Sequence, residues 1–163
     1  MTDDANASPA TPEHGGFAFL LVQLGMEAAR QFAERLAPLG VEPRHAGMLR
    51  RLAANEGKAQ QVIGELIGLN PTLMVFLVDE LEGRGLIERR RNPADRRSYA
   101  LYLTPAGRDM LSKILDAGQV HQARFGASLN EAEQEQLTEL LRRIARDQRI
   151  TGENLPGIPP RRR

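Results

Sequence analysis

The sequence predicts a mainly α-helical protein with a small β-hairpin wing: a winged helix-turn-helix with a helical dimerisation region. Three observations predict this class. Apolar residues recur with a period of about 3.6 along most of the chain. Two short predicted helices are separated by a tight turn that contains Gly68, as in a helix-turn-helix. An arginine-rich pair of predicted strands comes next, and this order of elements is typical of a winged helix.

The first predicted helix covers about residues 16–37 and ends before Pro38 and Gly40. Its apolar residues fall on one helical stripe, namely Phe17, Leu20, Leu21, Leu24, Ala28 and Phe32. A second helix begins at Pro43, because proline suits the first turn of a helix, and it ends before Gly57.

The predicted helix-turn-helix consists of a short helix over about residues 60–67 and a longer helix that begins at Pro71. In the short helix we expect Val62, Ile63 and Leu66 to face inward. Asn70 can cap the longer helix with its side chain. The longer helix carries one apolar stripe made of Met74, Leu77, Val78 and Leu81.

The predicted hairpin joins the strands "LIERRR" and "RRSYALYLT" through a turn at residues 92–95. Alternation in the second strand places Tyr99, Leu101 and Leu103 on one face. Between Arg84 and Arg108 the chain has seven arginines against two acids, although the whole chain has a net charge of only +1. A local basic block indicates a polyanionic partner, and the alternative is a basic face that only contacts solvent.

Two further helices are predicted after the hairpin. Thr104-Pro105 begins one that reaches about Phe125, and Asn130 with Glu133 forms a capping box for the other. The last helix carries an apolar stripe made of Leu137, Leu140, Leu141 and Ile144. Residues 1–15 and 151–163 lack any such periodicity, and we expect disordered tails there.

The composition excludes several classes of protein. The chain has no cysteine, which rules out disulfides and cysteine-based zinc sites. The three histidines (His14, His45 and His121) lack the spacing of metal ligands, so we expect no metal and no cofactor. No catalytic motif is present, so we expect no enzyme. The apolar run Phe17–Val22 is too short to span a bilayer, and we expect a cytoplasmic protein without membrane partners.

The segment "DELEGRGLIERRRNPADRRSYALYLTPAGRDML", residues 79–111, resembles the MarR family of bacterial regulators. Asp95 and Arg97 match the wing-tip pair of that family, and Leu101–Thr104 with Gly107 match its Leu-x-Leu-Thr motif and the glycine after that motif. The resemblance implies one domain over residues 16–150, with the winged helix-turn-helix at about 43–104 and dimerisation helices at about 16–37 and 105–149.

The resemblance also implies a function. A protein of this family is expected to be a homodimeric repressor that binds double-stranded DNA at an inverted-repeat operator and is released by a small-molecule ligand, such as an aromatic or other lipophilic effector. An alternative is a winged-helix module for low-specificity architectural DNA binding or for protein contacts.

The sequence departs from the family pattern at three places. Asn92 stands where the wing usually begins with Asp, and Lys58-Ala59 precedes the helix at residue 60 without the usual Ser or Thr cap. The helix that begins at Pro71 has Thr72 followed by Leu73, Val75 and Phe76, where the family often has Arg and paired Thr or Ser. We therefore expect few hydrogen bonds to bases.

On the family geometry, the helix that begins at Pro71 enters the major groove. Thr72 is then expected to bind a base edge or a phosphate, and Val75 and Phe76 to contact thymine methyl groups. The alternative for Phe76 is a place in the core. At the start of the preceding helix, Lys58, Gln60 and Gln61 are expected to bind phosphate.

The wing supplies the remaining predicted contacts. Arg97 is expected to enter a narrow minor groove, where the electrostatic potential attracts guanidinium, and Asp95 to hold it. The alternative is that this pair only stabilises the turn. Arg91 and Arg96 are expected to bind phosphates, whereas Arg89 has the alternative of pairing with an acid of its own domain.

The resemblance places a ligand pocket between the dimer interface and the winged domain. Candidate lining residues there are Phe19 and Gln23 on the first helix, with His45 and Met48 on the second. The alternative for His45 is a structural role.

Overall fold

The computed structural model describes residues 15–92 and 98–150. The wing-tip residues Asp95, Arg96 and Arg97 lie outside the described residues. The same holds for the two predicted tails, apart from Gly15.

The described chain is mainly helical with one two-stranded antiparallel hairpin, as the sequence predicts. Its elements are α1 (Phe17–Leu36), the 3-10 helix η1 (Ala37–Leu39), α2 (Pro43–Ala53), α3 (Gln60–Leu66), α4 (Pro71–Gly83), β1 (Ile87–Arg91), β2 (Tyr99–Leu103), α5 (Pro105–Phe125) and α6 (Glu131–Asp147).

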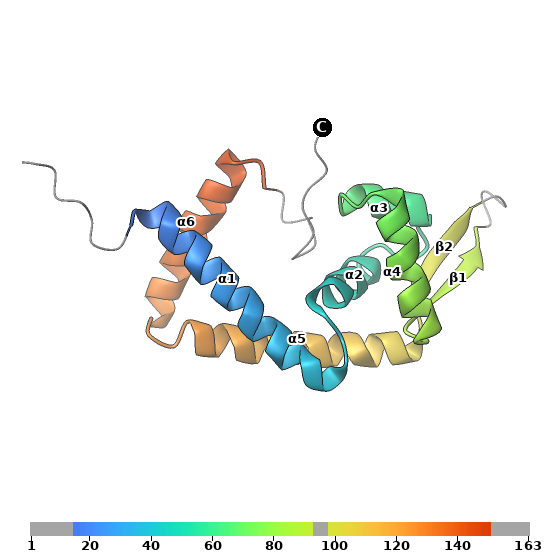
Figure 1. Ribbon diagram of the computed structural model, residues 1–163, viewed down its shortest axis with the longest axis horizontal. Helices are drawn as coiled ribbons and strands as arrows, with labels where there is room; N and C mark the ends of the chain where they lie inside the picture. Colours follow the sequence, from blue (N-terminus) through green and yellow to red (C-terminus); the bar gives the residue numbers. More distant parts are fainter. Residues whose placement is uncertain (1–14, 93–97, 151–163) are drawn as a thin grey trace, which may run out of the picture.

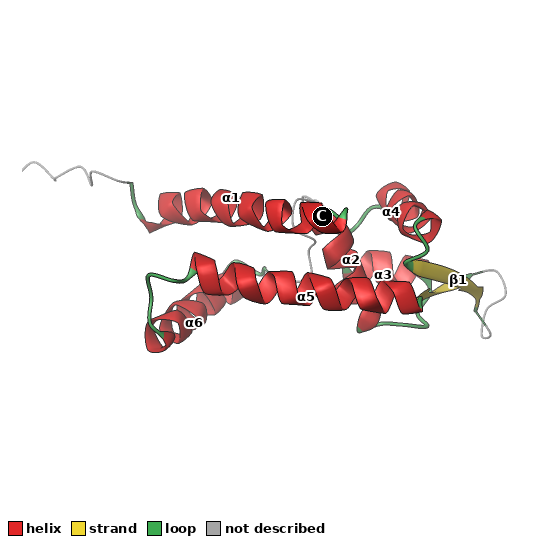
Figure 2. Ribbon diagram, turned by 90° about the horizontal axis from the view of Figure 1, so that it is seen from below, coloured by secondary structure: helices red, strands yellow, loops and turns green. Residues whose placement is uncertain are grey.

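The elements form two regions joined by α5 (Figure 1). Helices α2, α3 and α4 pack with the hairpin into a body that we call the winged unit, residues 43–103. Helix α1 packs along α5, and α6 comes after α5 at the end away from the hairpin. Helix α1 contacts α5 and crosses it obliquely in Figure 1, and Figure 2 shows α5 extending from the hairpin to α6. One long helix therefore connects the two regions.

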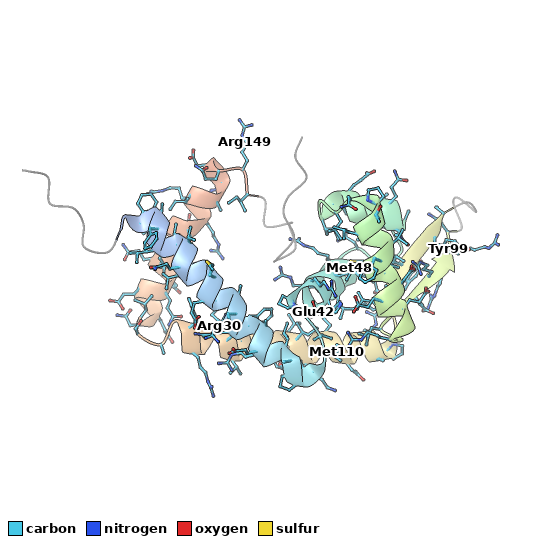
Figure 3. All side chains as sticks on the ribbon, viewed as in Figure 1. Arg30, Glu42, Met48, Tyr99, Met110 and Arg149 are labelled. Carbon is cyan, nitrogen blue, oxygen red and sulfur yellow. The ribbon has the colours of Figure 1, made fainter. Side chains whose placement is uncertain are left out.

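The hydrophobic core lies mainly in the winged unit, where Met48 is completely buried (Figure 3). The end of α1 and the middle of α5 close the core with Leu36 and Ile114. In α3 the prediction was wrong for two residues, because Val62 and Leu66 are 42% and 37% exposed. The large apolar residues that are buried in this segment are Ile63 and Ile67, which lie four positions apart and therefore on one helical face.

The helix starts have the caps that the sequence predicts. The Asn70 side chain accepts a hydrogen bond from the Leu73 backbone N–H at 2.9 Å at the start of α4. Asn130 does the same for α6, where it forms a capping box with Glu133. Helix α3 has Ala59 at its N-cap position and therefore lacks a side-chain cap. One of the four free N–H groups at its start thus lacks the partner that α4 and α6 have.

Gly107 allows α5 to begin directly against the hairpin. A Cβ atom at this position would lie 1.9 Å from the backbone oxygen of Leu86. The same oxygen accepts the backbone N–H of Thr104 at 3.2 Å, so the chain before β1 and the start of α5 touch through their backbones. Only glycine fits this contact without moving the helix.

The hairpin pairs Ile87 with Leu103 at its base and Arg91 with Tyr99 near its tip. Of the three residues predicted to share one face, Leu101 and Leu103 are buried, whereas Tyr99 is 48% exposed and lies beyond the edge of the core. Ala100 belongs to the opposite face and is nevertheless buried, because Ala59 forms a β-bridge to it.

The region of α1 and α6 leaves apolar side chains uncovered in the single chain. No residue of α6 is buried, and its stripe of Leu137, Leu140, Leu141 and Ile144 is 37–45% exposed. Phe17, Leu20 and Leu24 of α1 are also exposed. Within residues 15–92 and 98–150, no single helix is long and apolar enough to cross a bilayer; only α3 and α4 together meet the test, as a pair bent by 115°.

Candidate nucleic-acid interface

Helix α4 divides into a buried and an exposed face. Its four-residue apolar stripe is buried, and Thr72, Val75, Phe76 and Asp79 lie on the exposed side. Val75 is 46% and Phe76 58% exposed, so the alternative that Phe76 belongs to the core is wrong. The helix contains no lysine or arginine.

Arg44, in the first turn of α2, lies over Phe76. Its guanidinium carbon is 5.9 Å from the centre of the phenyl ring, within the range of a cation–π contact. The same guanidinium lies 3.2 Å from Glu42 Oε2 and 3.4 Å from Glu80 Oε2. Arg44 is not among the predicted contact residues, because nothing in the sequence around it indicates that α4 lies beside it.

Arg89 of β1 ties the hairpin to both helices of the helix-turn-helix. Its guanidinium forms ion pairs with Asp79 and Glu82 of α4, and its Nε donates to Gln60 Oε1 of α3 at 3.2 Å. Its backbone N–H also donates to Glu82 at 3.0 Å. The expectation that Arg89 pairs with acids of its own domain is confirmed.

The electrostatics of Arg89 favour its charged form. Burial lowers the pKa of the guanidinium, but the hydrogen bonds to Asp79 and Glu82 raise it by more, so the pKa lies above its ordinary value. Asp79 and Gln60 are correspondingly engaged with Arg89. Gln60, one of the predicted contact residues, therefore joins α3 to the hairpin through its hydrogen bond with Arg89.

A groove of about 900 Å³ lies between α3, the start of α4 and the hairpin. Predicted contact residues from two helices line it: Gln60 and Gln61 of α3, and Val75 of α4. Tyr99 of β2 forms part of its other wall. Because Arg91 lies directly opposite Tyr99 in the hairpin, the two side chains share one face, and Arg91 is exposed.

Lys58 lies directly before α3 and is exposed. Its backbone is held in place, because its N–H donates to Asn55 and its carbonyl accepts from Leu101. Gln61 is exposed, and its side chain donates to Glu65 at 3.1 Å. The structure thus brings Gln60, Gln61 and Val75 together around the groove, with Thr72, Phe76 and Arg91 exposed on the elements that form it.

The predicted ligand residues do not come together within one chain. Phe19 and Gln23 lie in the half of α1 that is remote from α2 (Figure 1), and both are exposed. His45 and Met48 are 1% and 0% exposed. Within the described part of the chain, the four side chains therefore lie apart.

His45 has a structural role. Its Nδ1 accepts the backbone N–H of Glu42 at 3.0 Å, so the ring proton of the neutral form is on Nε2, which lies 3.0 Å from Glu80 Oε2. The hydrogen bond from His45 holds the pKa of Glu80 below its ordinary value, against the opposing effect of burial. His45 thereby joins the start of α2 to α4.

His121 of α5 packs between two aromatic rings. The centroids of Phe32 and Phe125 are each 5.6 Å from its own. Burial, with a contribution from nearby Arg35, lowers the pKa of His121. In the described part of the chain, no group of three or more potential metal ligands occurs.

Comparison with known proteins agrees with this geometry. The model of the MarR family matches residues 39–98. A protein of Thauera aromatica, whose name assigns it to transcriptional regulation of the hcr operon, is 35% identical over 156 residues, which cover 93% of this chain and 94% of that protein.

Two solved structures extend the likeness to three dimensions. The transcriptional repressor CouR, solved bound to a 23-mer DNA duplex, is 31% identical with a TM-score of 0.73, covering 80% of this chain and 92% of its own. A MarR-family transcriptional regulator from Rhodococcus sp. RHA1 is 29% identical with a TM-score of 0.67, covering 78% of this chain and 91% of its own. The chain belongs to the MarR family of winged-helix transcriptional regulators.

Proposed function

We propose that this protein is a homodimeric repressor that binds an inverted-repeat DNA operator and is released by a small-molecule ligand. The observation that carries the proposal is the outward face of α4, which is exposed beside a groove shared with α3 and the hairpin. Helix α4 enters the major groove of DNA. The DNA backbone next to α4 then runs along the groove on the protein surface towards the hairpin. The protein acts by binding rather than by catalysis, and it acts in the cytoplasm.

The uncovered apolar side chains of α1 and α6 support the dimer. A second groove, of about 630 Å³, lies between the first turn of α1 and the end of α6, with Phe17, Leu21 and Ile144 among its lining residues. An exposed apolar surface of this kind marks a protein interface, and a second copy of the chain covers it.

For Arg97 and Asp95 we propose the roles that the sequence predicts. Arg97 enters the minor groove with Asp95 holding it, and Arg96 binds phosphate beside Arg91. The exposed position of Arg91 on the same face as Tyr99 supports this part of the proposal, because it directs the basic hairpin towards the groove side of the winged unit. Arg97→Ala is expected to weaken duplex binding at moderate salt, and unchanged binding by a folded variant would contradict this role.

The effector is a small aromatic or other lipophilic molecule. A site that includes Phe19, Gln23, His45 and Met48 would need the dimer partner or a conformational change, since these residues lie apart in one chain and two of them are buried. The test is a screen for compounds that release the protein from its operator.

A second candidate function is low-specificity architectural DNA binding or protein binding. The observation that favours it is the absence of any basic side chain from α4 together with the exposure of Leu73, Val75 and Phe76.

Selection of bound fragments from genomic DNA, followed by competition and footprinting, tests both candidates. The regulator is expected to prefer its operator over bulk DNA by at least roughly 1,000-fold. Its footprint is expected to contain two half-sites about 10 bp apart, related by a two-fold axis. Equal binding to random sequence would support the architectural function, and a single unrepeated half-site would contradict the dimer.

A further inference from the structure

The side chains that α4 exposes are mostly apolar. Phe76 and Thr72 lie near the centre of the exposed face, Val75 and Leu73 lie on its two flanks, and Val75, Leu73 and Phe76 are 46%, 44% and 58% exposed. A helix that reads bases through hydrogen bonds would expose amide or guanidinium groups here. This helix exposes methyl groups and a phenyl ring.

The acids of the same face are already engaged. Asp79 forms an ion pair with Arg89, and Glu80 lies 3.4 Å from the Arg44 guanidinium and 3.0 Å from His45. A carboxylate that is held by a cation of its own domain is a poor acceptor for a cytosine amino group, because the existing pair would have to break first. Thr72 is then the polar side chain left for base contacts on the exposed face of α4.

One group in the major groove is apolar, namely the methyl on C5 of a pyrimidine. Thymine carries it, and so does 5-methylcytosine, whereas uracil and cytosine do not. We propose that Phe76 and Val75 read C5-methyl groups, so that operator affinity depends on pyrimidine methylation and not only on base identity. This inference rests on the proposed function, since it specifies how α4 reads the operator.

Arg44 is a positioning residue in this scheme. Its guanidinium lies 5.9 Å from the centre of the Phe76 ring and near the carboxylates of Glu42 and Glu80, so it is anchored on two helices. It covers one side of the ring and leaves the remainder of the phenyl group exposed. The contact favours orientations in which the ring lies against the guanidinium before DNA arrives, which lowers the entropy lost on binding.

The test uses two pairs of DNA duplexes, each of which differs by methyl groups alone. Once the operator is selected, the first pair compares thymine with uracil at each thymine position of a half-site. The second pair compares 5-methylcytosine with cytosine at the same position. Affinities of the full-length dimer are measured by fluorescence anisotropy at fixed salt. At contacted positions we expect about a fourfold loss for each methyl removed, given the usual contribution of one buried methyl group.

The protein variants separate methyl reading from general binding. Phe76→Ala is expected to weaken binding to the thymine operator and to abolish the difference between thymine and uracil at its position. Arg44→Ala is expected to reduce that difference without removing it. Leu66→Ala, which truncates an exposed apolar side chain of α3, is the matched control and is expected to leave the difference unchanged.

Equal affinity for the thymine and uracil operators overturns the inference while leaving the proposed function intact. A methyl preference that persists undiminished in Phe76→Ala also overturns it. If Phe76→Ala does not fold, the affinities for the thymine and uracil operators are compared for the unaltered protein and for Phe76→Leu. These two comparisons still test whether Phe76 reads the methyl group. Failure to bind any selected duplex would instead contradict the proposed function itself.

Discussion

Arg108, in the first turn of α5, donates two hydrogen bonds to the carboxylate of Glu56, at 2.8 and 2.9 Å. The same carboxylate accepts the backbone N–H of Leu103 at 2.7 Å. One side chain from the loop after α2 thus joins the end of β2 to the start of α5. Burial raises the pKa of Glu56, but the hydrogen bonds from Arg108 and Leu103 lower it by more, and the pKa lies below the ordinary 4.5.

Glu56 should therefore make the stability of the protein depend on pH. A carboxyl whose pKa is lower in the folded chain stabilises the fold above its unfolded pKa, and this stabilisation is lost as the pH falls through the folded value. We expect Glu56→Gln to lower the free energy of unfolding by about 1 kcal/mol at pH 7. The deficit should shrink as the pH is lowered below 4.5. Urea unfolding of both proteins at several pH values measures it, and a deficit that is equal at every pH would contradict the prediction.

Gly107→Ala should destabilise the protein. The new Cβ would meet the Leu86 backbone oxygen at 1.9 Å, so α5 must move away from the hairpin, at a cost of about 1–3 kcal/mol or more. The matched control is Gly118→Ala in the same helix, where a Cβ meets nothing within 4 Å. The control should raise stability by up to about 1 kcal/mol, because alanine favours the helix. Thermal unfolding compares the two, and a similar melting temperature for both variants would show that the close contact does not matter.

Arg89→Ala should weaken DNA binding although Arg89 itself does not need to touch DNA. Its removal leaves Asp79 and Glu82 without their shared partner and frees their negative charge beside the DNA-binding face, besides loosening the hairpin. We expect the free energy of unfolding to fall by about 2 kcal/mol. Arg90→Ala is the control, because Arg90 is exposed and its partners, Glu88 and the Tyr102 ring at 4.5 Å, both belong to the hairpin. If the two variants bind operator DNA equally, the network around Arg89 has no role in binding.

Arg91→Ala should change the salt dependence of binding. If the dimer neutralises about eight phosphates, log K falls with log salt at a slope near −7. Losing one contact per subunit makes the slope shallower by about 2, and affinity should fall similarly for specific and non-specific DNA. Arg142→Ala on α6, remote from the hairpin, should leave the slope unchanged. Titrations at four salt concentrations measure the slope. An unaltered slope for Arg91→Ala would show that Arg91 does not contact phosphate.

The order of the elements and most of their limits could be predicted from the sequence because the signals are local. Pro43, Pro71 and Pro105 each stand at the first position of a helix, and Asn70 and Asn130 cap helices with their own side chains. Such features act within one turn and need no knowledge of the rest of the chain. The family resemblance added the arrangement of these elements.

Periodicity was less informative for α3, which has only seven residues. Two turns of helix allow more than one apolar stripe. Whether Val62 and Leu66 or Ile63 and Ile67 face the core depends on where the neighbouring elements lie. Tyr99 shows the same limit in the hairpin, since alternation predicts a shared face but not how far the core extends beneath it.

The contacts that organise the candidate site join residues far apart in the sequence. Arg44 on Phe76, Glu56 on Arg108 and the close contact of Gly107 with Leu86 each depend on tertiary packing. No local pattern separates Arg44 from an ordinary surface arginine, and for Phe76 the sequence left core and surface open. The packing of α2 against α4 decides both.

Helix α5 has 21 residues, which corresponds to a length of about 31 Å. One end is fixed to the winged unit through the backbone contact at Gly107, and the other lies beside α1 and leads into α6. It is therefore a rigid lever. A tilt of α5 by about 10° at its α6 end displaces the winged unit, and with it α4, by about 5 Å, which exceeds the rise of one base pair, about 3.4 Å. In the proposed dimer, a small rearrangement among the helices far from DNA would therefore be sufficient to move the two α4 helices out of register with their half-sites.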